Sequence, residues 1–216
     1  SADEMNVLQT VFWSTGASRL LLAERLAYSK TKANSVIASL LDQGLLEETG
    51  LQGSTGGRRP ETVQLNGKLG VLVGADLGAT SLDVAIMDPG LNVLARHSEA
   101  ADVRSGPGVV LARVRQLMRQ LLVQCDKTPR QVIGIGIGVP GPVDFASGQL
   151  VNPPLMPHWD SFSIRDYLRE DYTAPVFVDN DVNLMALGEL WRLQRSLSNF
   201  LVIKVGTGIG CGIVCH

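Results

Sequence analysis

The sequence predicts two domains, a small winged helix-turn-helix unit followed by a larger α/β domain. Three helical patterns and then two short strand patterns around a glycine-rich loop occupy residues 1–68. Further along, strand-like runs alternate with longer helical patterns, as in α/β proteins. The short polar stretch at 66–69 separates the two regions and predicts domains at 1–68 and 69–216.

The composition is that of a globular chain. The 216 residues are 45% hydrophobic and 19% charged with a formal net charge of −2, so any contact with nucleic acid must be local. No apolar run reaches the roughly 18–20 residues that span a bilayer, and the first residues do not resemble a signal peptide. Three cysteines without a framework spacing are typical of a reducing compartment. We therefore expect a cytoplasmic protein without membrane attachment.

The helices of the first domain follow one another closely. Apolar residues from Val7 to Phe12 have helical spacing, and a second helix follows with Ser18 as its N-cap. The third helix begins at Ser29 and ends before Gly44, a residue type that commonly terminates helices. The apolar side of the third helix is expected to pack on the core, which leaves its polar side exposed to solvent.

The third helix and the loop of the hairpin carry side chains that suit DNA. Hydroxyls and amides on the helix can reach base edges, and lysines can reach phosphates. In the loop, neighbouring glycines leave two arginines free to enter a minor groove or lie along phosphates. The predicted DNA-binding residues are Ser29, Lys30, Thr31, Lys32, Asn34, Ser35, Arg58 and Arg59. The alternative is a solvated charged face, because small helical triplets are common.

The second region begins with strands before any helix appears. Strand-like runs lie at 71–76, 82–88, 92–98, 132–138, 175–179 and 199–205, and helical patterns lie near 107–125, 162–171 and 182–195. Because three strands come first, we expect an opening meander followed by βα units. This order argues against a simple Rossmann fold, in which a helix follows the first strand.

Three glycine-rich turns have the composition of sites that hold a phosphate or another polar ligand. They lie at 76–81, 134–144 and 205–212. Glycine lets backbone N–H groups come close to an anion, and a threonine hydroxyl adds a donor. None is a P-loop, because no Gly-Lys-Ser/Thr follows. Taken singly, each turn can also mark a bend in a strand.

Asp179, Asn180 and Asp181 follow a buried strand directly. The carboxyl ends of strands are where α/β proteins place ligand-binding groups. An aspartate beside a sugar hydroxyl can accept its proton as a general base. The alternative is capping of the next helix. We expect one of the two aspartates to form that cap and the polar run to exceed what a cap needs.

In this order the motifs resemble the ROK family, which joins repressors, uncharacterised open reading frames and sugar kinases. The resemblance rests on "GGRRPETVQLN", "DLGATS", "GIGVPGPVD" and "VGTGIG". The regulators of the family are the closer match, because the kinases lack the N-terminal helix-turn-helix. The resemblance implies an actin-like, ribonuclease-H-like fold from residue 69 onward.

The resemblance also implies roles for single residues. Asp181 corresponds to the catalytic base of the kinases, and Asn180 to a partner of a sugar hydroxyl. The implied sugar-binding residues are Gly138, Asn152, Asn180 and Asp181. The implied phosphate-binding residues are Asp76, Gly78, Thr80, Gly206, Thr207 and Gly208.

One departure from the kinases lies in the first turn. Ala79 and Ser81 stand where the kinases have a second glycine and a lysine. A methyl group at 79 would crowd a phosphate, and the missing lysine removes its charge partner. The residues implied to bind the sugar therefore match the pattern of the kinases better than the residues implied to bind ATP. We expect the phosphate-binding residues to be vestigial, and we expect the protein to bind a sugar without phosphorylating it.

A second departure concerns the end of the sequence. The family continues past the third turn into a second lobe with a cysteine-rich zinc motif. We therefore expect an incomplete actin-like domain and no cofactor in residues 69–216. Cys211, Cys215 and His216 lie close together, but their local spacing suits a metal poorly, and we expect none. Trp159 is expected to pack in the core, with a place beside the sugar as the alternative.

These features predict a sugar-responsive regulator, a repressor, that binds operator DNA as a homodimer or higher oligomer. The effector would be a sugar or sugar phosphate, which shifts the population of lobe arrangements and thereby the spacing of the DNA-binding units. The first alternative is an ATP-dependent sugar kinase with a DNA-binding unit and Asp181 as its base. The second alternative is a regulator whose effector is a protein.

Overall fold

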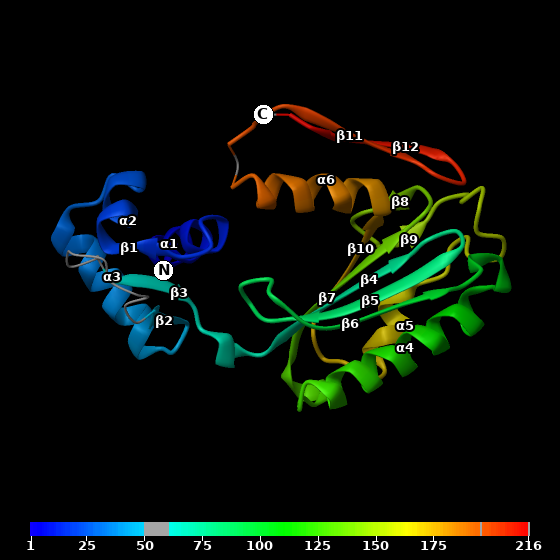
Figure 1. Cartoon of the computed structure of the whole chain (residues 1–216), viewed down its shortest axis with the longest axis horizontal. Coiled ribbons are helices and arrows are strands. Elements are labelled where there is room, and N and C mark those ends of the chain that lie inside the picture. The colour runs from blue at the N-terminus through cyan, green and yellow to red at the C-terminus, as the bar shows by residue number, and fades with distance from the viewer. Residues whose placement is uncertain (50–60, 195, 216) are drawn as a thin grey trace. The chain divides into compact units, whose positions relative to one another are not determined.

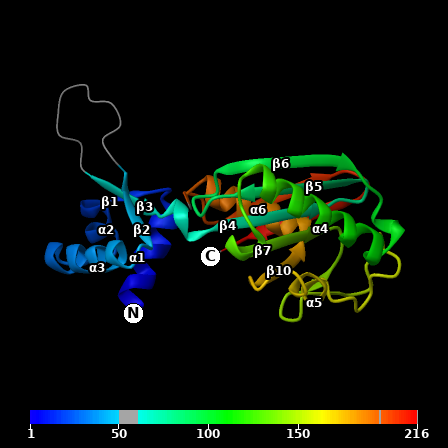
Figure 2. The same cartoon turned by 90° about the horizontal axis from the view of Figure 1, so that it is seen from below.

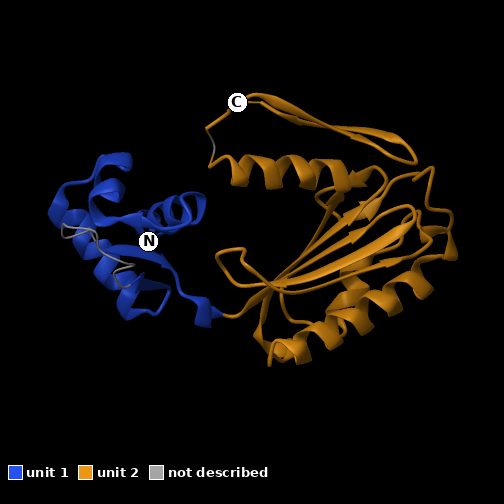
Figure 3. Cartoon of the chain, in the orientation of Figure 1, with its two compact units in different colours: residues 1–69 blue, residues 70–216 orange. Residues whose placement is uncertain are grey.

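The structure is a computed structural model. It describes residues 1–49, 61–194 and 196–215. The chain forms two compact units, Ser1–Leu69 and Gly70–His216 (Figure 3). Arg58 and Arg59 lie outside the described residues. Within the described part of the chain, no helix is long and apolar enough to cross a membrane.

The first unit joins three helices to a small antiparallel sheet (Figure 1). Its elements are α1 (Ala2–Trp13), β1 (Ala17–Ser18), α2 (Arg19–Arg25), α3 (Lys30–Asp42), β2 (Leu46–Thr49) and β3 (Thr62–Leu65). In the sheet, β3 lies between the other two strands. The three predicted helices and the two predicted hairpin strands are confirmed.

Serine hydroxyls start the second and third helices. The Ser18 hydroxyl accepts a hydrogen bond from the Leu21 N–H (3.1 Å), which confirms Ser18 as the N-cap of α2. Ser29 caps α3 in the same way through the Lys32 N–H (3.2 Å). Each cap satisfies a first-turn N–H that has no partner within its helix. Between the helices, Ala27 takes a left-handed φ of +52°, which reverses the chain sharply.

The helices and the small sheet share one core. Ile37 and Leu40 of α3 are fully buried together with Leu22 of α2. Val36 is only partly buried, because the buried stripe of α3 runs through Ala33, Ile37 and Leu40 at helical spacing. The opposite side of α3 therefore faces solvent.

The second unit is built on a five-stranded mixed sheet with the strand order β10-β7-β4-β5-β6. An antiparallel meander is formed by β4 (Val71–Leu77), β5 (Ser81–Met87) and β6 (Val93–Ala100). Two strands then run parallel to β4, namely β7 (Val132–Val139) and β10 (Val176–Asn180). The predicted meander followed by βα units is confirmed.

Helices lie on both sides of this sheet (Figures 1 and 2). On one side lie α4 (Pro107–Gln124) and α5 (Ile164–Arg169), and α4 buries seven apolar side chains at helical spacing. On the other side lies α6 (Asp181–Arg192) with the hairpin of β11 (Phe200–Val205) and β12 (Ile209–Val214). Two further strands, β8 (Val143–Asp144) and β9 (Gln149–Leu150), pair as a small antiparallel hairpin.

Trp159 packs inside the second unit. Its side chain is fully buried, and its indole N–H donates a hydrogen bond to the Val103 carbonyl oxygen (2.9 Å). The Phe162 ring meets the indole edge-on, with centroids 6.1 Å apart. The expected packing role is confirmed, and the alternative of a face open to a sugar is wrong.

Two glycines let the β11–β12 hairpin lie against α6. A Cβ at Gly212 would lie 2.5 Å from the Val182 carbonyl oxygen and 2.8 Å from Cβ of Ala186. A Cβ at Gly210 would lie 2.5 Å from Cγ2 of Val182. These distances are too short for any side chain, so only glycine allows this approach. The contact holds Lys204 of β11 beside the first turn of α6.

Candidate functional site

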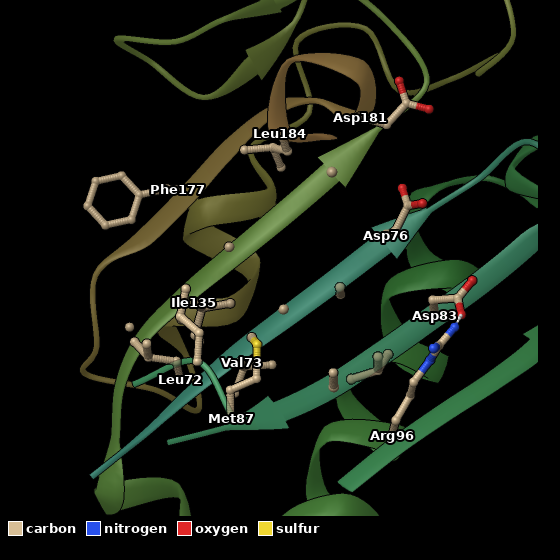
Figure 4. Close-up of a pocket in the computed structure, with 18 of the residues that line it drawn as sticks. Leu72, Val73, Asp76, Asp83, Met87, Arg96, Ile135, Phe177, Asp181 and Leu184 are labelled. Carbon is tan, nitrogen blue, oxygen red and sulfur yellow. Dashed lines mark hydrogen bonds and ion pairs between the residues drawn. The ribbon is translucent and has the colours of Figure 1, made fainter. Parts of the chain in front are cut away.

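The carboxyl ends of β4, β7 and β10 converge near Asp181. Asp76 lies near the end of β4, Gly138 near the end of β7, and Asp181 opens α6 directly after β10. A Cβ at Gly138 would lie 3.2 Å from Asp76 Oδ1 and 3.5 Å from Cα of Asp181. Glycine at 138 therefore lets the two acidic residues approach each other. Figure 4 shows both carboxyl groups at the same end of the sheet.

A cavity of about 540 Å³, here called the turn cavity, is lined by residues of all three glycine turns. Its volume is within the range of ordinary small-molecule sites. The predicted ligand residues that line it are Gly78, Thr80, Asn180, Asp181, Gly206, Thr207 and Gly208, and Ala79 and Ser81 line it as well. Most of the ligand residues that the sequence predicts are therefore brought together.

Three predicted residues lie outside the turn cavity. Asp76 and Gly138 line a second cavity of about 690 Å³ over the sheet, here called the sheet cavity (Figure 4). Asp181 lines both cavities. Asn152 lines neither of them; it is exposed, and its backbone N–H donates to Asp160 Oδ1 (2.8 Å). Apolar side chains dominate the sheet cavity, so the turn cavity is the better site for a polyhydroxyl ligand.

Each carboxylate oxygen of Asp181 accepts a hydrogen bond. The residue is only 6% exposed. Its Oδ1 accepts a hydrogen bond from the Val182 N–H (2.8 Å), and its Oδ2 accepts one from Lys204 Nζ (2.6 Å). A buried carboxylate needs such partners, because removing a charge from water is costly. Asp181 is therefore held as a paired ion in this structure.

Lys204 is a site residue that sequence reasoning missed. Its side chain is 34% exposed and forms the ion pair with Asp181. Burial alone would lower the pKa of Lys204, but the hydrogen bond to Asp181 and the charges of Asp181 and Asp76 raise it, so the ammonium stays charged. The available signal was one charged residue within the apolar strand "FLVIKV", directly before a glycine turn.

Asp76 is less well satisfied than Asp181. Its Oδ1 is buried and has no hydrogen-bond partner among the described residues. Burial raises the pKa of Asp76; the charge of Lys204 opposes this rise, and the charges of Asp181 and Asp83 add to it. The site therefore contains one paired carboxylate and one orphaned oxygen.

Asn180 is the N-cap of α6, so the expectation that an aspartate caps this helix is wrong. Its side-chain oxygen accepts hydrogen bonds from the Val182 N–H (3.0 Å) and the Asn183 N–H (3.4 Å). Its amide nitrogen donates to the Gly141 carbonyl oxygen (3.1 Å). Asp179 accepts from the Asn183 side chain instead (3.0 Å). Asn180 thus ties the loop after β7 to the start of α6.

The polar residues of α3 point in different directions. Thr31 and Ser35 lie opposite the buried stripe of the helix and are exposed, and Asn34 is exposed beside them. Ser29 is used as the N-cap. Lys30 is exposed at the start of the helix. A partner that approaches the exposed side of α3 would meet Thr31 and Ser35 first.

Lys32 is engaged within the first unit. Its Nζ lies 2.9 Å from Asp3 Oδ1 and 4.1 Å from the centre of the Tyr28 ring. The Tyr28 hydroxyl donates to the same Asp3 oxygen (2.6 Å). Hydrogen bonds from Tyr28 and Lys32 lower the pKa of Asp3. The sequence suggests a lysine free for phosphates, whereas the structure ties Lys32 to α1.

Cys211 and Cys215 are exposed free thiols. Over residues 1–49, 61–194 and 196–215, no group of three or more His, Cys, Asp or Glu side chains is placed to hold a metal ion. His216, which the sequence places next to Cys215, lies outside the described residues.

The sequence profile of the ROK family matches residues 72–216, which is more than half of the chain. The chain belongs to the ROK family. The family resemblance predicted from the glycine turns is thereby confirmed. The second unit has the fold of this family and is preceded by a helical N-terminal unit.

Similar proteins include both regulators and kinases. A xylose repressor from Caldicellulosiruptor bescii is 27% identical over 213 residues, 98% of this chain and 53% of the repressor. A glucokinase from Halalkalibacterium halodurans is 30% identical over 145 residues, 67% of this chain and 44% of the kinase. The crystal structure of a ROK family transcriptional regulator, a homologue of the E. coli MLC protein, has a TM-score of 0.69 at 22% identity and covers 98% of this chain and 55% of its own. The chain thus spans about half the length of the curated relatives it matches.

Proposed function

We propose that this chain is a sugar-responsive transcriptional repressor. The observation that carries the proposal is the extent of the match to the xylose repressor. That match runs through both units and covers 98% of the chain, whereas the match to the glucokinase covers 67%. A chain that shares the N-terminal unit of repressors as well as the ROK fold is best explained as a DNA-binding regulator.

The first unit supplies the DNA contacts in this proposal. It is a winged helix-turn-helix, with α2 and α3 around the turn at Ala27 and with β2 and β3 as the wing. Thr31, Asn34 and Ser35 on the exposed side of α3 reach base edges in a major groove. Lys30 and the wing arginines contact phosphates. Two chains bind two half-sites of an operator, so the active form is a homodimer or a higher oligomer.

The turn cavity supplies the effector site. Thr80, Ser81 and Thr207 offer hydroxyl groups, the glycine turns offer backbone N–H groups, and Asp181 accepts a hydrogen bond from a sugar hydroxyl. These groups suit a neutral monosaccharide or a sugar phosphate, and no metal or cofactor is needed. Xylose is the first sugar to test, because relatives over the whole chain are named xylose repressors.

The chain is proposed to bind its sugar without phosphorylating it. The turn at Ala79 and Ser81 lacks the second glycine and the lysine expected of a kinase. An ATP-dependent sugar kinase remains the second candidate, because glucokinases match residues of the ROK domain at 30% identity.

Fluorescence anisotropy of a labelled duplex from upstream of the chain's own gene tests the proposal. The titration is run at two salt concentrations with D-xylose, D-glucose, other pentoses and hexoses, and amino sugars. We expect tight, sequence-specific binding that one sugar releases. Asp181→Asn should keep the DNA affinity and lose the response to sugar. Absence of specific binding under every condition would contradict the regulator, and hexose-dependent ATP hydrolysis lost in Asp181→Asn would favour the kinase.

A further inference from the structure

Asp181 and Lys204 meet at the edge of the turn cavity, and Asp76 lies close to Asp181 beside Gly138. Asp181 opens α6, Lys204 lies on β11, and Asp76 lies on β4. Lys204 donates to Asp181 (2.6 Å), and its charge also acts on Asp76. The two carboxyl-bearing residues flank Gly138 closely. The ammonium is therefore paired with Asp181, and its charge opposes the rise in the pKa of Asp76.

The two carboxylates are used unequally. Asp181 has a donor on each oxygen, the Val182 N–H on one and Lys204 on the other. Asp76 Oδ1 is buried without a partner among the described residues. The ammonium is therefore paired with one acceptor while a second acceptor nearby is left without a donor.

A ligand hydroxyl in the turn cavity competes with Lys204. The cavity is lined by Asp181 and Lys204 but not by Asp76. The Val182 N–H belongs to the backbone of α6 and stays on Oδ1 of Asp181, whereas a sugar hydroxyl that donates to Oδ2 competes there with the ammonium of Lys204. Lysine has a flexible four-carbon stem, and the vacant Asp76 oxygen offers its ammonium a new partner.

We propose that Lys204 is a ligand-displaced switch that moves its ammonium from Asp181 to Asp76 when a sugar hydroxyl binds Asp181. The proposal rests on the proposed function in one respect, namely that the ligand of the turn cavity is a sugar. The exchange changes the partner of the β11–β12 hairpin from the first turn of α6 to strand β4 of the sheet. Effector binding is thereby converted into a change in the contacts between the hairpin and the sheet.

The switch also sets the threshold for the effector. In the unliganded protein, the ion pair with Lys204 must be broken before Asp181 can accept from the sugar, which lowers the apparent affinity. Lys204 therefore determines the sensitivity of the site to the sugar.

A cycle of sugar affinities measured by calorimetry tests the exchange. The variants are Lys204→Met, Asp76→Asn and the double variant, titrated with D-xylose and D-glucose, and Lys127→Met is the matched control outside both cavities. We expect Lys204→Met to bind the sugar at least about fivefold more tightly, because the competitor is gone. Asp76→Asn should weaken binding about fivefold when Lys204 is present and have no effect when it is absent. Equal effects of Asp76→Asn in both backgrounds, or weaker binding by Lys204→Met, would overturn the switch.

A second cycle needs no sugar. The stability coupling between Lys204 and Asp76 is measured by urea unfolding with Asp181 intact and in Asp181→Asn. We expect the coupling to grow in Asp181→Asn, because the ammonium then moves to Asp76. Absence of coupling in that background overturns the switch even if a sugar binds. Growth of the coupling without any sugar binding supports the ion-pair exchange and contradicts the sugar-responsive function instead.

Discussion

Asp76 carries an energetic cost at the scale of a single residue. Its Oδ1 is buried and receives no hydrogen bond from the described residues. Burial raises its pKa, against the charge of Lys204 and together with those of Asp181 and Asp83. A raised pKa means that the folded state binds the proton more tightly than the unfolded chain does. Stability is therefore lost as the pH rises from the ordinary aspartate pKa through the raised value.

We expect Asp76→Asn to raise the free energy of unfolding at neutral pH. The gain should shrink toward zero as the pH falls below the ordinary aspartate range, because the carboxyl is then protonated in the folded and in the unfolded state. Urea unfolding across this pH range measures the effect. Asp83→Asn is the control, since Asp83 already has Ser98 and Arg96 as partners and should gain nothing. A variant less stable than the wild type at neutral pH would show that Asp76 is better satisfied than its burial indicates.

Single residues also mark the limit of prediction from sequence. Asp181 could be predicted because a run of polar residues follows a buried strand. Lys204 could not, because one lysine in a strand indicates a solvent-facing position as readily as a site. The sequence favours an aspartate as the N-cap of α6, whereas the cap is Asn180. Asn180 also donates a hydrogen bond to Gly141, which lies far away in the sequence and gives no local signal.

At the scale of elements, the β11–β12 hairpin depends on glycines where it meets α6. Lys204 can reach Asp181 only while the hairpin lies against the first turns of that helix. The backbone of Val182 leaves no room for a methyl group at Gly212. The glycines of the third turn thus have a packing role in addition to any ligand contact.

We expect Gly212→Ala to destabilise the second unit by about 1–3 kcal/mol, because the hairpin must move away from α6. Gly188→Ala is the matched control: Gly188 lies within α6 and has open space around it. Alanine there should stabilise the helix by up to about 1 kcal/mol. Urea unfolding of both variants measures the difference. Equal stability of Gly212→Ala and the wild type would mean that the hairpin does not need this close contact.

The exposed side of α3 should determine sequence preference. We expect Thr31→Ala and Asn34→Ala to change the preferred base pairs, with losses of about 1–3 kcal/mol at the affected positions only. Binding to a library of duplexes measures the preference. Replacing Arg58 and Arg59 by alanine is the contrasting change and should weaken binding to all sequences and lower the salt dependence. A uniform loss across sequences for the α3 variants would remove that helix from base recognition.

The elements themselves could be predicted well, and their surroundings less well. Helical spacing and serine caps locate α2 and α3 because these signals are local. The engagement of Lys32 with Asp3 and Tyr28 could not be predicted, because it depends on how α1 packs against α3. The burial of Trp159 was expected, yet its hydrogen bond to Val103 comes from a distant part of the chain.

At the scale of the whole molecule, the change from helical patterns to strand patterns near residue 69 predicts the boundary between the two units. The turn cavity could be predicted only through the family resemblance, because loops far apart in the sequence form it. The proposed function couples this cavity to DNA, and thermodynamics requires any such coupling to be reciprocal. If the sugar weakens DNA binding by a given factor, DNA must weaken sugar binding by the same factor.

Calorimetric titration of the sugar into the free protein and into the protein saturated with its duplex tests whether the turn cavity regulates DNA binding. We predict a lower sugar affinity in the DNA complex, by the same factor by which the sugar lowers DNA affinity in the anisotropy titration. In Asp181→Asn, neither binding reaction should depend on the other. Equal sugar affinity with and without DNA would contradict a sugar-responsive regulator, because the turn cavity would then hold a ligand that does not regulate the first unit.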